Sequence, residues 1–218
     1  MLTRTSYVSR LEDVPYDGLG FAVLKNWISP PNQDFDVRAS PIFNGTVNDR
    51  KRRQASLTKD QSPWARRLFH KIDSETNRTR SDAVLLKSDP GCEAQQPHCD
   101  YVPTDGILTA SDRTIPLSLI VAIQDGTMLD VWPHSQRVIR GYYTETGIFD
   151  LNRKRLTLDA GDAVLFRADL VHAGSAYSDY NERIHVFLDT PTIPRHPNQT
   201  WIIETHAPLE IRGCFTDI

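Results

Sequence analysis

The sequence predicts a mainly β protein of the α+β class, in which one helix in the N-terminal part packs on a β-sandwich or barrel. After residue 80 the chain consists of short runs rich in strand-forming residues, separated by turn residues. No long helical pattern lies between these runs, which argues against an alternating βαβ fold. Before residue 80, one segment repeats its apolar residues at the helical period.

The length and composition are those of one folded unit. The chain has 218 residues, 39% of them hydrophobic and 24% charged, which is enough for one sizeable core. We therefore expect a single domain over 1–218, with supporting elements in 1–80, a β core in 81–190 and a C-terminal extension in 191–218. Three scattered cysteines make no disulfide framework, and no stretch approaches the roughly 18 apolar residues of a membrane span. An intracellular protein, cytoplasmic or nuclear, is expected.

Two elements are expected before the β-rich region. Residues 20–28 have the composition of a strand, which prolines end. A helix should begin at Pro63, because Ser62 can cap it and proline suits the first helical position. Its core-facing side would carry the apolar residues spaced four apart, namely Trp64, Leu68 and Ile72.

The expected strands follow one another closely. They lie within 82–88, 92–100, 115–125, 127–133, 137–145, 154–159, 161–167, 170–174 and 183–189. The run 117–123 is almost entirely apolar, as in a strand buried on both faces. Gly161 and Asp162 are expected to form the turn that precedes the strand "AVLF".

His98 and Asp100 are the first candidates for chemistry. On a strand, side chains two residues apart leave the same face, so this pair would point into one space while Cys99 points away as a packing residue. A strand can present two metal ligands in this way. His172, at the end of a later strand, is the best third ligand, and His134 and His185 are weaker candidates. We interpret the other histidines as ordinary core or surface residues, namely His70, His196 and His206.

Arg183 adds a possible anion site. In 183–189, Ile184, Val186 and Leu188 alternate with Arg183, His185 and Phe187, so one face is aliphatic and the other carries Arg183 inward. A buried arginine needs an anion, and a bound carboxylate ligand can accept two hydrogen bonds from its planar guanidinium. Two histidines and one carboxylate around a metal with open positions are typical of non-haem iron(II) oxygenases.

At these residues the chain resembles the Fe(II)/2-oxoglutarate-dependent dioxygenase superfamily, and within it the prolyl-hydroxylase-like and phytanoyl-CoA-hydroxylase-like members. The resemblance covers about half of the chain, from roughly Ala83 to Asp189, and rests on "SDPGCEAQQPHCDY" and "GDAVLFRADLVHAG". It implies a double-stranded β-helix, the cupin-like jelly roll, supported by N-terminal helices.

The resemblance also implies a site. His98, Asp100 and His172 would bind Fe(II), and Arg183 would bind the distal carboxylate of 2-oxoglutarate. The reaction would consume 2-oxoglutarate and O2, hydroxylate a substrate and release succinate and CO2, with ascorbate as an auxiliary reductant.

One cofactor contact departs from the family's pattern. Prolyl hydroxylases often place a cofactor-contacting tyrosine where this chain has Lys87 and Ser88. Tyr101 and Ser118 are candidate substitutes, and His185 could assist Arg183.

The substrate is left open by the sequence. Trp132 could line the substrate cavity or pack in the core. The segment from Asp49 to Arg80 contains ten Lys and Arg and four Asp and Glu, a net charge of +6. The remainder of the chain therefore has a net charge of −9. A polyanion or nucleic acid could bind this segment through Arg50–Arg53, although a basic segment such as 49–80 is more often a solvated helix face.

Other function classes fit part of the pattern. One alternative is a nucleic-acid-oxidising or demethylating member of the superfamily, for which Arg195 is only a loose analogue of the second arginine expected. Another is a cupin-like metal protein, such as a zinc isomerase or hydrolase, in which Arg183 would have less purpose. A third is a binding module with a degenerate metal site, although all three ligands are intact.

Overall fold

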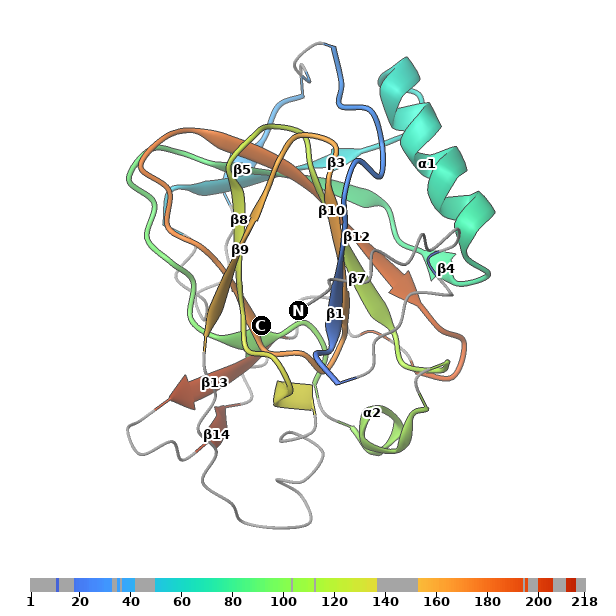
Figure 1. Ribbon diagram of the computed structural model, residues 1–218, viewed down its shortest axis with the longest axis vertical. Helices are drawn as coiled ribbons and strands as arrows, with labels where there is room; N and C mark the ends of the chain where they lie inside the picture. The colour runs from blue at the N-terminus through green and yellow to red at the C-terminus, as the bar shows by residue number, and fades with distance from the viewer. Residues whose placement is uncertain are drawn as a thin grey trace, which may run out of the picture.

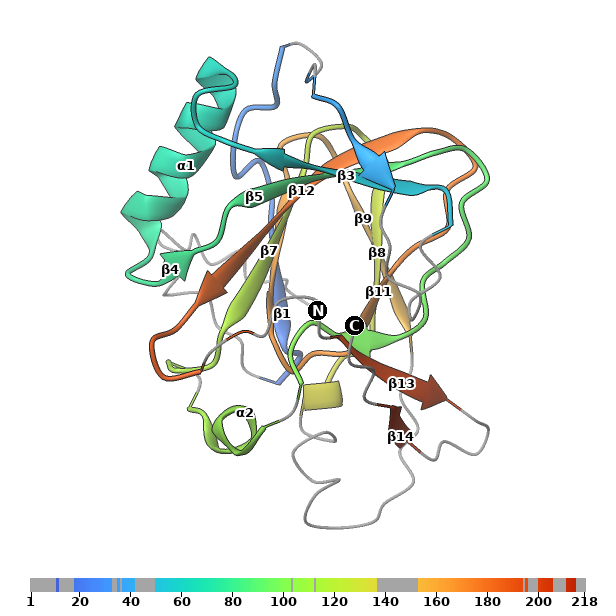
Figure 2. The same ribbon diagram turned by 180° about the vertical axis from the view of Figure 1, so that it is seen from behind.

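The chain folds into two antiparallel sheets that face each other, with one helix on the outside (Figure 1). The computed structural model describes residues 11, 18–32, 35, 37–41, 50–102, 104–111, 113–136, 153–193, 195, 200–205 and 211–214. Figure 2 shows the same arrangement from behind, with β8, β9 and β11 opposite β7 and β12. Every strand pairing is antiparallel, and most neighbours within a sheet are not consecutive in the chain. This is a jelly-roll-like architecture.

The larger sheet has eight strands. Its order is β1 (Phe21–Leu24), β10 (Ala163–Arg167), β7 (Leu117–Ala122), β12 (Asn181–Asp189), β5 (Ala83–Ser88), β3 (Arg52–Leu57) and β2 (Ser40–Pro41), and β4 (Thr79–Arg80) pairs with β12. The smaller sheet has the order β14 (Ile211–Cys214), β13 (Trp201–Thr205), β6 (His98–Cys99), β11 (His172–Gly174), β8 (Thr127–Val131) and β9 (Lys154–Leu158).

The central strands β7 and β10 of the larger sheet are buried on both faces. In β7, Leu119 and Val121 pack in one apolar cluster, while Ile120 and Ala122 pack in another between the sheets. All six residues of β7 are buried, as the apolar run 117–123 predicts. β12 alternates as expected too, because Ile184, Val186 and Leu188 join the outer cluster.

Helix α1 (Pro63–Glu75) covers the outer face of the larger sheet (Figure 1). It begins where the sequence predicts a helix, although three short strands precede it in the chain. The Ser62 hydroxyl accepts a 3.0 Å hydrogen bond from the Ala65 backbone N–H, which satisfies one of the unpaired donors of the first turn. The predicted stripe of Trp64, Leu68 and Ile72 is buried in the same cluster as β12. A second short helix, α2 (Asp105–Thr109), was not expected.

A tight turn leads into β10, at the predicted position. Gly161 has φ +93°, and a Cβ there would lie 2.5 Å from the Ile28 carbonyl oxygen, so only glycine fits. The Asp162 carboxylate accepts hydrogen bonds from the backbone N–H groups of Asn26 (2.9 Å) and Asp159 (3.0 Å) and pairs with Lys25. These contacts tie the turn to the segment after β1.

The basic segment 49–80 is divided between a strand and a helix. On α1, Arg66 and Arg67 are exposed, as expected of a solvated helix face, whereas Arg52–Leu57 of the segment belong to the larger sheet. Arg52 and Arg53 begin β3, and the Arg52 side chain is buried. Arg53 pairs with Asp89, and Lys51 donates to the Pro90 carbonyl oxygen. The charged first residues of β3 hide its strand pattern, because Ala55 and Leu57 are buried on one face and Arg52 is buried on the other.

Three further boundaries differ from expectation or fall outside the described residues. The first strand is shorter than 20–28 and ends at Leu24. The strand expected in 137–145 lies outside the described residues, as do His196 and His206. Within the C-terminal extension, β13 pairs with β6 and so joins the smaller sheet. Among the described residues, no helix is long and apolar enough to cross a membrane.

Candidate functional site

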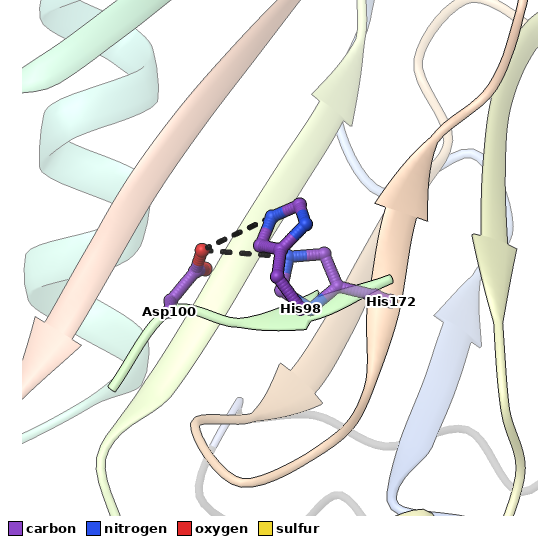
Figure 3. Close-up of side chains that lie close together, drawn as sticks. All are labelled: His98, Asp100 and His172. Atoms are coloured by element: carbon purple, nitrogen blue, oxygen red, sulfur yellow. Dashed lines mark ion pairs between the residues drawn. The ribbon is translucent and has the colours of Figure 1, made fainter. Parts of the chain in front are cut away.

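His98 and His172 lie side by side on neighbouring strands. They are register partners in the antiparallel pairing of β6 with β11, and their ring centroids are 4.5 Å apart. Asp100 follows immediately after the end of β6. The two-residue spacing and the strand pairing therefore place three side chains from distant parts of the sequence in one space, as the sequence predicts (Figure 3).

The three side chains could hold a metal ion. Asp100 Oδ1 lies 3.4 Å from His172 Nε2 and 3.9 Å from His98 Nε2, the two pairs dashed in Figure 3. One ligand atom from each residue lies within 4.8 Å of the others. Two imidazole nitrogens and one carboxylate oxygen are thus directed at a common point.

Backbone carbonyls fix both imidazoles. His98 Nδ1 lies 2.7 Å from the Gln96 carbonyl oxygen, and His172 Nδ1 lies 3.1 Å from that of Leu170. A carbonyl oxygen only accepts hydrogen bonds, so each Nδ1 carries a proton. In the neutral imidazole the lone pair is then on Nε2. This arrangement is typical of metal-binding histidines, whose second nitrogen is held by a hydrogen bond.

The electrostatics favour the protonation states that a metal requires at His98 and Asp100, but not at His172. Burial and the neighbouring His172 lower the pKa of His98 to about 4. Burial opposes the ionisation of Asp100, but the surrounding imidazoles, chiefly His172, outweigh it and hold the pKa of the carboxyl well below its usual range. The Asp100 carboxylate also outweighs burial at His172 and raises the pKa of that imidazole. At neutral pH Asp100 is therefore a carboxylate and His98 is a neutral ligand.

The second oxygen of Asp100 is held separately. Ser118 Oγ donates a 3.0 Å hydrogen bond to Asp100 Oδ2, and His185 Nε2 lies 3.6 Å from the same oxygen. Phe166 and Phe187 flank the His185 ring. Burial is the main reason that the pKa of His185 falls to about 4, so the imidazole is neutral.

A cavity of about 180 Å³ opens beside these residues. Its walls mix apolar side chains with a few polar ones, and the lining residues are Gln54, Val84, Leu86, Gln95, His98, Asp100, Ile120, Leu129, His172, Gly174, Arg183, His185, Phe187 and Thr200. The candidate metal ligands and Arg183 therefore share one cavity between the two sheets.

Arg183 is buried in this cavity, with 4% of its surface exposed. Arg183 Nη1 donates a 3.0 Å hydrogen bond to Ser88 Oγ, and its guanidinium lies 5.5 Å from the centre of the Tyr177 ring. Among the described residues no carboxylate forms an ion pair with Arg183. A buried guanidinium without a carboxylate partner in the described part of the chain is suited to an anionic ligand.

The remaining predicted residues fall into two groups. His185 lines the cavity, whereas Tyr101 and Ser118 do not. The Tyr101 hydroxyl donates to Asp189, and its ring packs in the outer cluster. Ser118 contacts the metal-ligand candidate Asp100. The structure thus gives neither residue a place in the cavity wall.

Trp132 and His134 lie outside the lining of the cavity. Trp132 is partly buried against a small cluster on the smaller sheet, formed by Cys99, Val171, Trp201 and Ile203. This placement favours packing, and it also confirms that Cys99 points away from the site.

His134 is exposed. Arg195 lies with its Nε 3.4 Å from Asp189 Oδ1 and its guanidinium over the Phe187 ring.

Ser88 is the residue that the sequence did not identify. It is fully buried at the end of β5 and accepts the hydrogen bond from Arg183. The sequence drew attention to this position only because a tyrosine was absent there. No local pattern shows which hydroxyl will face an arginine 95 residues away.

No protein-family model and no curated protein sequence matches the chain. Solved structures do match it. The epimerase SnoN from nogalamycin biosynthesis, described as non-haem and α-ketoglutarate-dependent, has 15% identity and a TM-score of 0.56 over 86% of this chain and 82% of its own. HygX from Streptomyces hygroscopicus, with nickel and 2-oxoglutarate bound, has 14% identity and a TM-score of 0.54 over 88% of this chain and 89% of its own.

A prolyl-4-hydroxylase from Pseudomonas putida is similar to the same extent. It has 11% identity and a TM-score of 0.54, and the match covers 80% of this chain and 95% of that one. The chain therefore shares the fold of these three structures. At such low identity the likeness concerns the fold, and it does not single out the prolyl-hydroxylase-like or phytanoyl-CoA-hydroxylase-like branch. In this fold, His98 and His172 lie on two neighbouring strands of the smaller sheet, Asp100 follows the first of them, and Arg183 lies on the larger sheet.

Proposed function

We propose that the protein is an Fe(II)- and 2-oxoglutarate-dependent dioxygenase in which His98, Asp100 and His172 hold the iron. The observation that carries this proposal is the shared cavity, which contains three metal-ligating side chains and a buried arginine with no carboxylate partner among the described residues. The two groups of residues suit different ligands: the three metal-ligating side chains suit a cation, and Arg183 suits an anion.

The donor set fits iron(II). Two neutral imidazole nitrogens and one carboxylate oxygen occupy one side of a metal, which leaves the opposite positions for co-substrates. When bound, iron together with 2-oxoglutarate and O2 supplies the oxidising chemistry, and the co-substrate leaves as succinate and CO2. The contribution of the protein is to fix the orientation of the three metal ligands. The carbonyls behind His98 and His172 and the hydroxyl on Asp100 do this.

Arg183 would bind the distal carboxylate of 2-oxoglutarate. A planar guanidinium can donate two parallel hydrogen bonds to a carboxylate, and burial strengthens both because water does not compete. Ser88 occupies only one N–H of Arg183 in the described structure. The remaining donors are available to a ligand, and the distance between Arg183 and the metal ligands would then select the length of the dicarboxylate.

The apolar walls support the same proposal. Ile120, Leu129 and Phe187 line the cavity together with the polar residues. Such side chains exclude water from the reacting groups and protect a reactive oxidant from side reactions. We propose that a C–H bond of the substrate is hydroxylated there, and we leave the substrate undetermined.

The alternatives have less support. A nucleic-acid substrate was suggested by Arg50–Arg53, but Arg52 is buried and Arg53 pairs with Asp89. Only Arg50 and Lys51 of this run are exposed without a carboxylate partner among the described residues. A zinc isomerase or hydrolase of the cupin type would use the same three ligands. It would give no purpose to Arg183, whose burial needs an anion.

Two measurements on purified protein test the proposal. The first is 2-oxoglutarate binding, by calorimetry without O2, to protein loaded with Ni(II). The second is succinate formation under air by protein loaded with Fe(II). Wild type is compared with His172→Ala and Arg183→Met, and with Arg67→Met as a matched control, because Arg67 is exposed on α1.

Wild type and Arg67→Met should bind 2-oxoglutarate and release succinate. His172→Ala should lose metal-dependent binding, and Arg183→Met should weaken 2-oxoglutarate binding at least about a hundred-fold, since a buried charged pair is lost. If wild type loaded with metal binds no 2-oxoglutarate, the proposal is wrong and the cupin alternative gains. If Arg183→Met binds as wild type does, the assignment of Arg183 is wrong.

A further inference from the structure

Arg52 is a second buried arginine close to the cavity. It is 2% exposed and lies on β3, next to β5 in the larger sheet. Its Nη1 donates a 3.0 Å hydrogen bond to Ser88 Oγ. Its Nη2 faces three backbone carbonyl oxygens, those of Glu93 (2.8 Å), Ser175 (2.8 Å) and Gly174 (3.3 Å). One guanidinium therefore connects a side chain and two separate loop segments.

Ser88 joins Arg52 to Arg183. Its hydroxyl oxygen accepts from Arg52 Nη1 and from Arg183 Nη1, each at 3.0 Å. A hydroxyl oxygen has two lone pairs, so both are used by the two arginines. Ser88 pairs with Arg52 across β3 and β5, and β5 pairs on its other side with β12, which carries Arg183. The contact thus runs across three adjacent strands.

The carbonyls that Arg52 contacts belong to the segments of the candidate metal ligands. Gly174 and Ser175 follow His172 at the end of β11, and Glu93 precedes His98 in the segment that leads to β6. Gly174 is also close to Arg52, because a Cβ on Gly174 would lie 3.1 Å from Arg52 Nη1. The rigid fork of Arg52 sets the distance between these segments and Ser88.

We propose that Arg52 is a positioning residue for Arg183, acting through Ser88, and that it ties the cofactor-binding arginine to the strands of the metal ligands. This inference rests on the proposed binding of 2-oxoglutarate by Arg183. With Nη1 held by Ser88, the Arg183 guanidinium is oriented before the ligand arrives. Less conformational freedom is then lost on binding, so the affinity for the dicarboxylate is higher.

Arg53 provides a matched control. It is the next residue on β3 and points to the other face, where Nε and Nη2 donate to the two oxygens of Asp89 at 3.0 and 2.6 Å. Its side chain is 38% exposed. Arg53→Lys is the same charge-conserving substitution on the same strand, at a side chain that contacts Asp89 instead of Ser88.

The test measures 2-oxoglutarate binding, by calorimetry without O2, to Ni(II)-loaded wild type, Arg52→Lys, Ser88→Ala and Arg53→Lys. Lysine keeps the charge of Arg52 but lacks its fork, and Ser88→Ala removes the shared acceptor with little change in volume. Both variants should bind 2-oxoglutarate about ten-fold more weakly than wild type, the loss expected for one hydrogen bond to a charged group. Arg53→Lys should bind as wild type does.

Two further comparisons separate positioning from a merely structural role. In the Arg183→Met background, Arg52→Lys should cause no additional loss, because Arg52 acts through Arg183. With 2-oxobutyrate, which lacks the distal carboxylate, wild type and Arg52→Lys should bind equally. Thermal unfolding of each variant verifies that the protein is folded, and Ser88→Ala decides the matter if Arg52→Lys does not fold.

The outcomes distinguish this inference from the proposed function. If wild type fails to bind 2-oxoglutarate, both are wrong. If Arg183→Met abolishes binding while Ser88→Ala and Arg52→Lys bind within two-fold of wild type, the proposed function stands and the role of Arg52 is refuted. An equal loss for 2-oxobutyrate and 2-oxoglutarate would also refute it.

Discussion

Ser118 Oγ donates a hydrogen bond of 3.0 Å to Asp100 Oδ2, whereas Asp100 Oδ1 faces His172 Nε2 at 3.4 Å. The two oxygens of one carboxylate therefore have different partners. Ser118 lies on β7 of the larger sheet and is fully buried. Its hydroxyl restricts the rotation of the carboxylate and presents a single oxygen to the space between the histidines.

We expect Ser118→Ala to weaken metal binding about ten-fold, because partners behind a metal ligand orient it and raise its affinity. The measurement is Ni(II) affinity by calorimetry. Ser56→Ala is the control, since Ser56 is exposed on β3 and its substitution should have no effect. Unchanged Ni(II) affinity in folded Ser118→Ala would show that Asp100 needs no help from the hydroxyl.

Trp132 should contribute to stability and not to cofactor binding. It packs against the cluster of Cys99 and Trp201 and does not line the cavity. Trp132→Ala should lower the free energy of unfolding by about 2 kcal/mol, less than for a fully buried tryptophan. Denaturant unfolding measures this change, and 2-oxoglutarate affinity should stay at the wild-type value. A loss of affinity without a loss of stability would assign Trp132 to the cavity instead.

Leu68 should be a main contact between α1 and the larger sheet. It is fully buried in the cluster that includes Ile184 and Val186. Leu68→Ala should lower the free energy of unfolding by about 3 kcal/mol, through lost burial and the cavity left behind. The neighbouring Arg67 is exposed, and Arg67→Ala should change stability by less than about 0.5 kcal/mol. Equal effects of the two substitutions in denaturant unfolding would contradict this packing.

Asp162 should make the protein less stable in acid. Burial opposes its ionisation, but Lys25 and the N–H groups of Asn26 and Asp159 outweigh burial and lower the pKa of its carboxyl. A lowered pKa in the folded state means that the stabilisation is present above the unfolded pKa of about 3.9 and is lost as pH falls through the folded pKa.

The corresponding variant is Asp162→Asn, compared with wild type in urea unfolding from pH 7 to pH 2. At pH 7 the variant should be less stable by about 2 kcal/mol, the contribution of hydrogen bonds to a charged group. The difference should shrink as the pH falls below about 4, because wild type then loses its carboxylate as well. A difference that stays constant over this range would mean that the charge of Asp162 contributes nothing.

The sequence predicted those parts of the site that depend on local geometry. A strand alternates its side chains at every second residue, so Arg183 and His185 face one way while Ile184, Val186 and Leu188 face the other, as the structure confirms. The same periodicity placed His98 and Asp100 on one side and Cys99 on the other. The cap at Ser62 and the turn at Gly161 are also local, because they depend on one residue's hydrogen bonds or backbone angles.

The strand β3 was not predicted, because its first two residues are arginines within the basic segment. Arg52 is a buried member of β3, and its burial depends on Ser88 and on carbonyl groups that come from other segments. No residue pattern near Arg52 in the sequence predicts these partners, because they are distant in the chain. For the same reason Tyr101 and Ser118 were assigned to the cofactor, whereas the fold directs them to Asp189 and Asp100.

By itself the sequence determined which residues share a strand face, such as His98 with Asp100 and Arg183 with His185. Only the tertiary structure decided which strands are neighbours, and with them the contacts of Ser88, Arg52 and Ser118. The physical reason is that side-chain direction follows from the covalent geometry of each strand, whereas strand order follows from the packing of the whole chain. Ser88 and Arg183 are 95 residues apart, and they meet only because β5 and β12 pair.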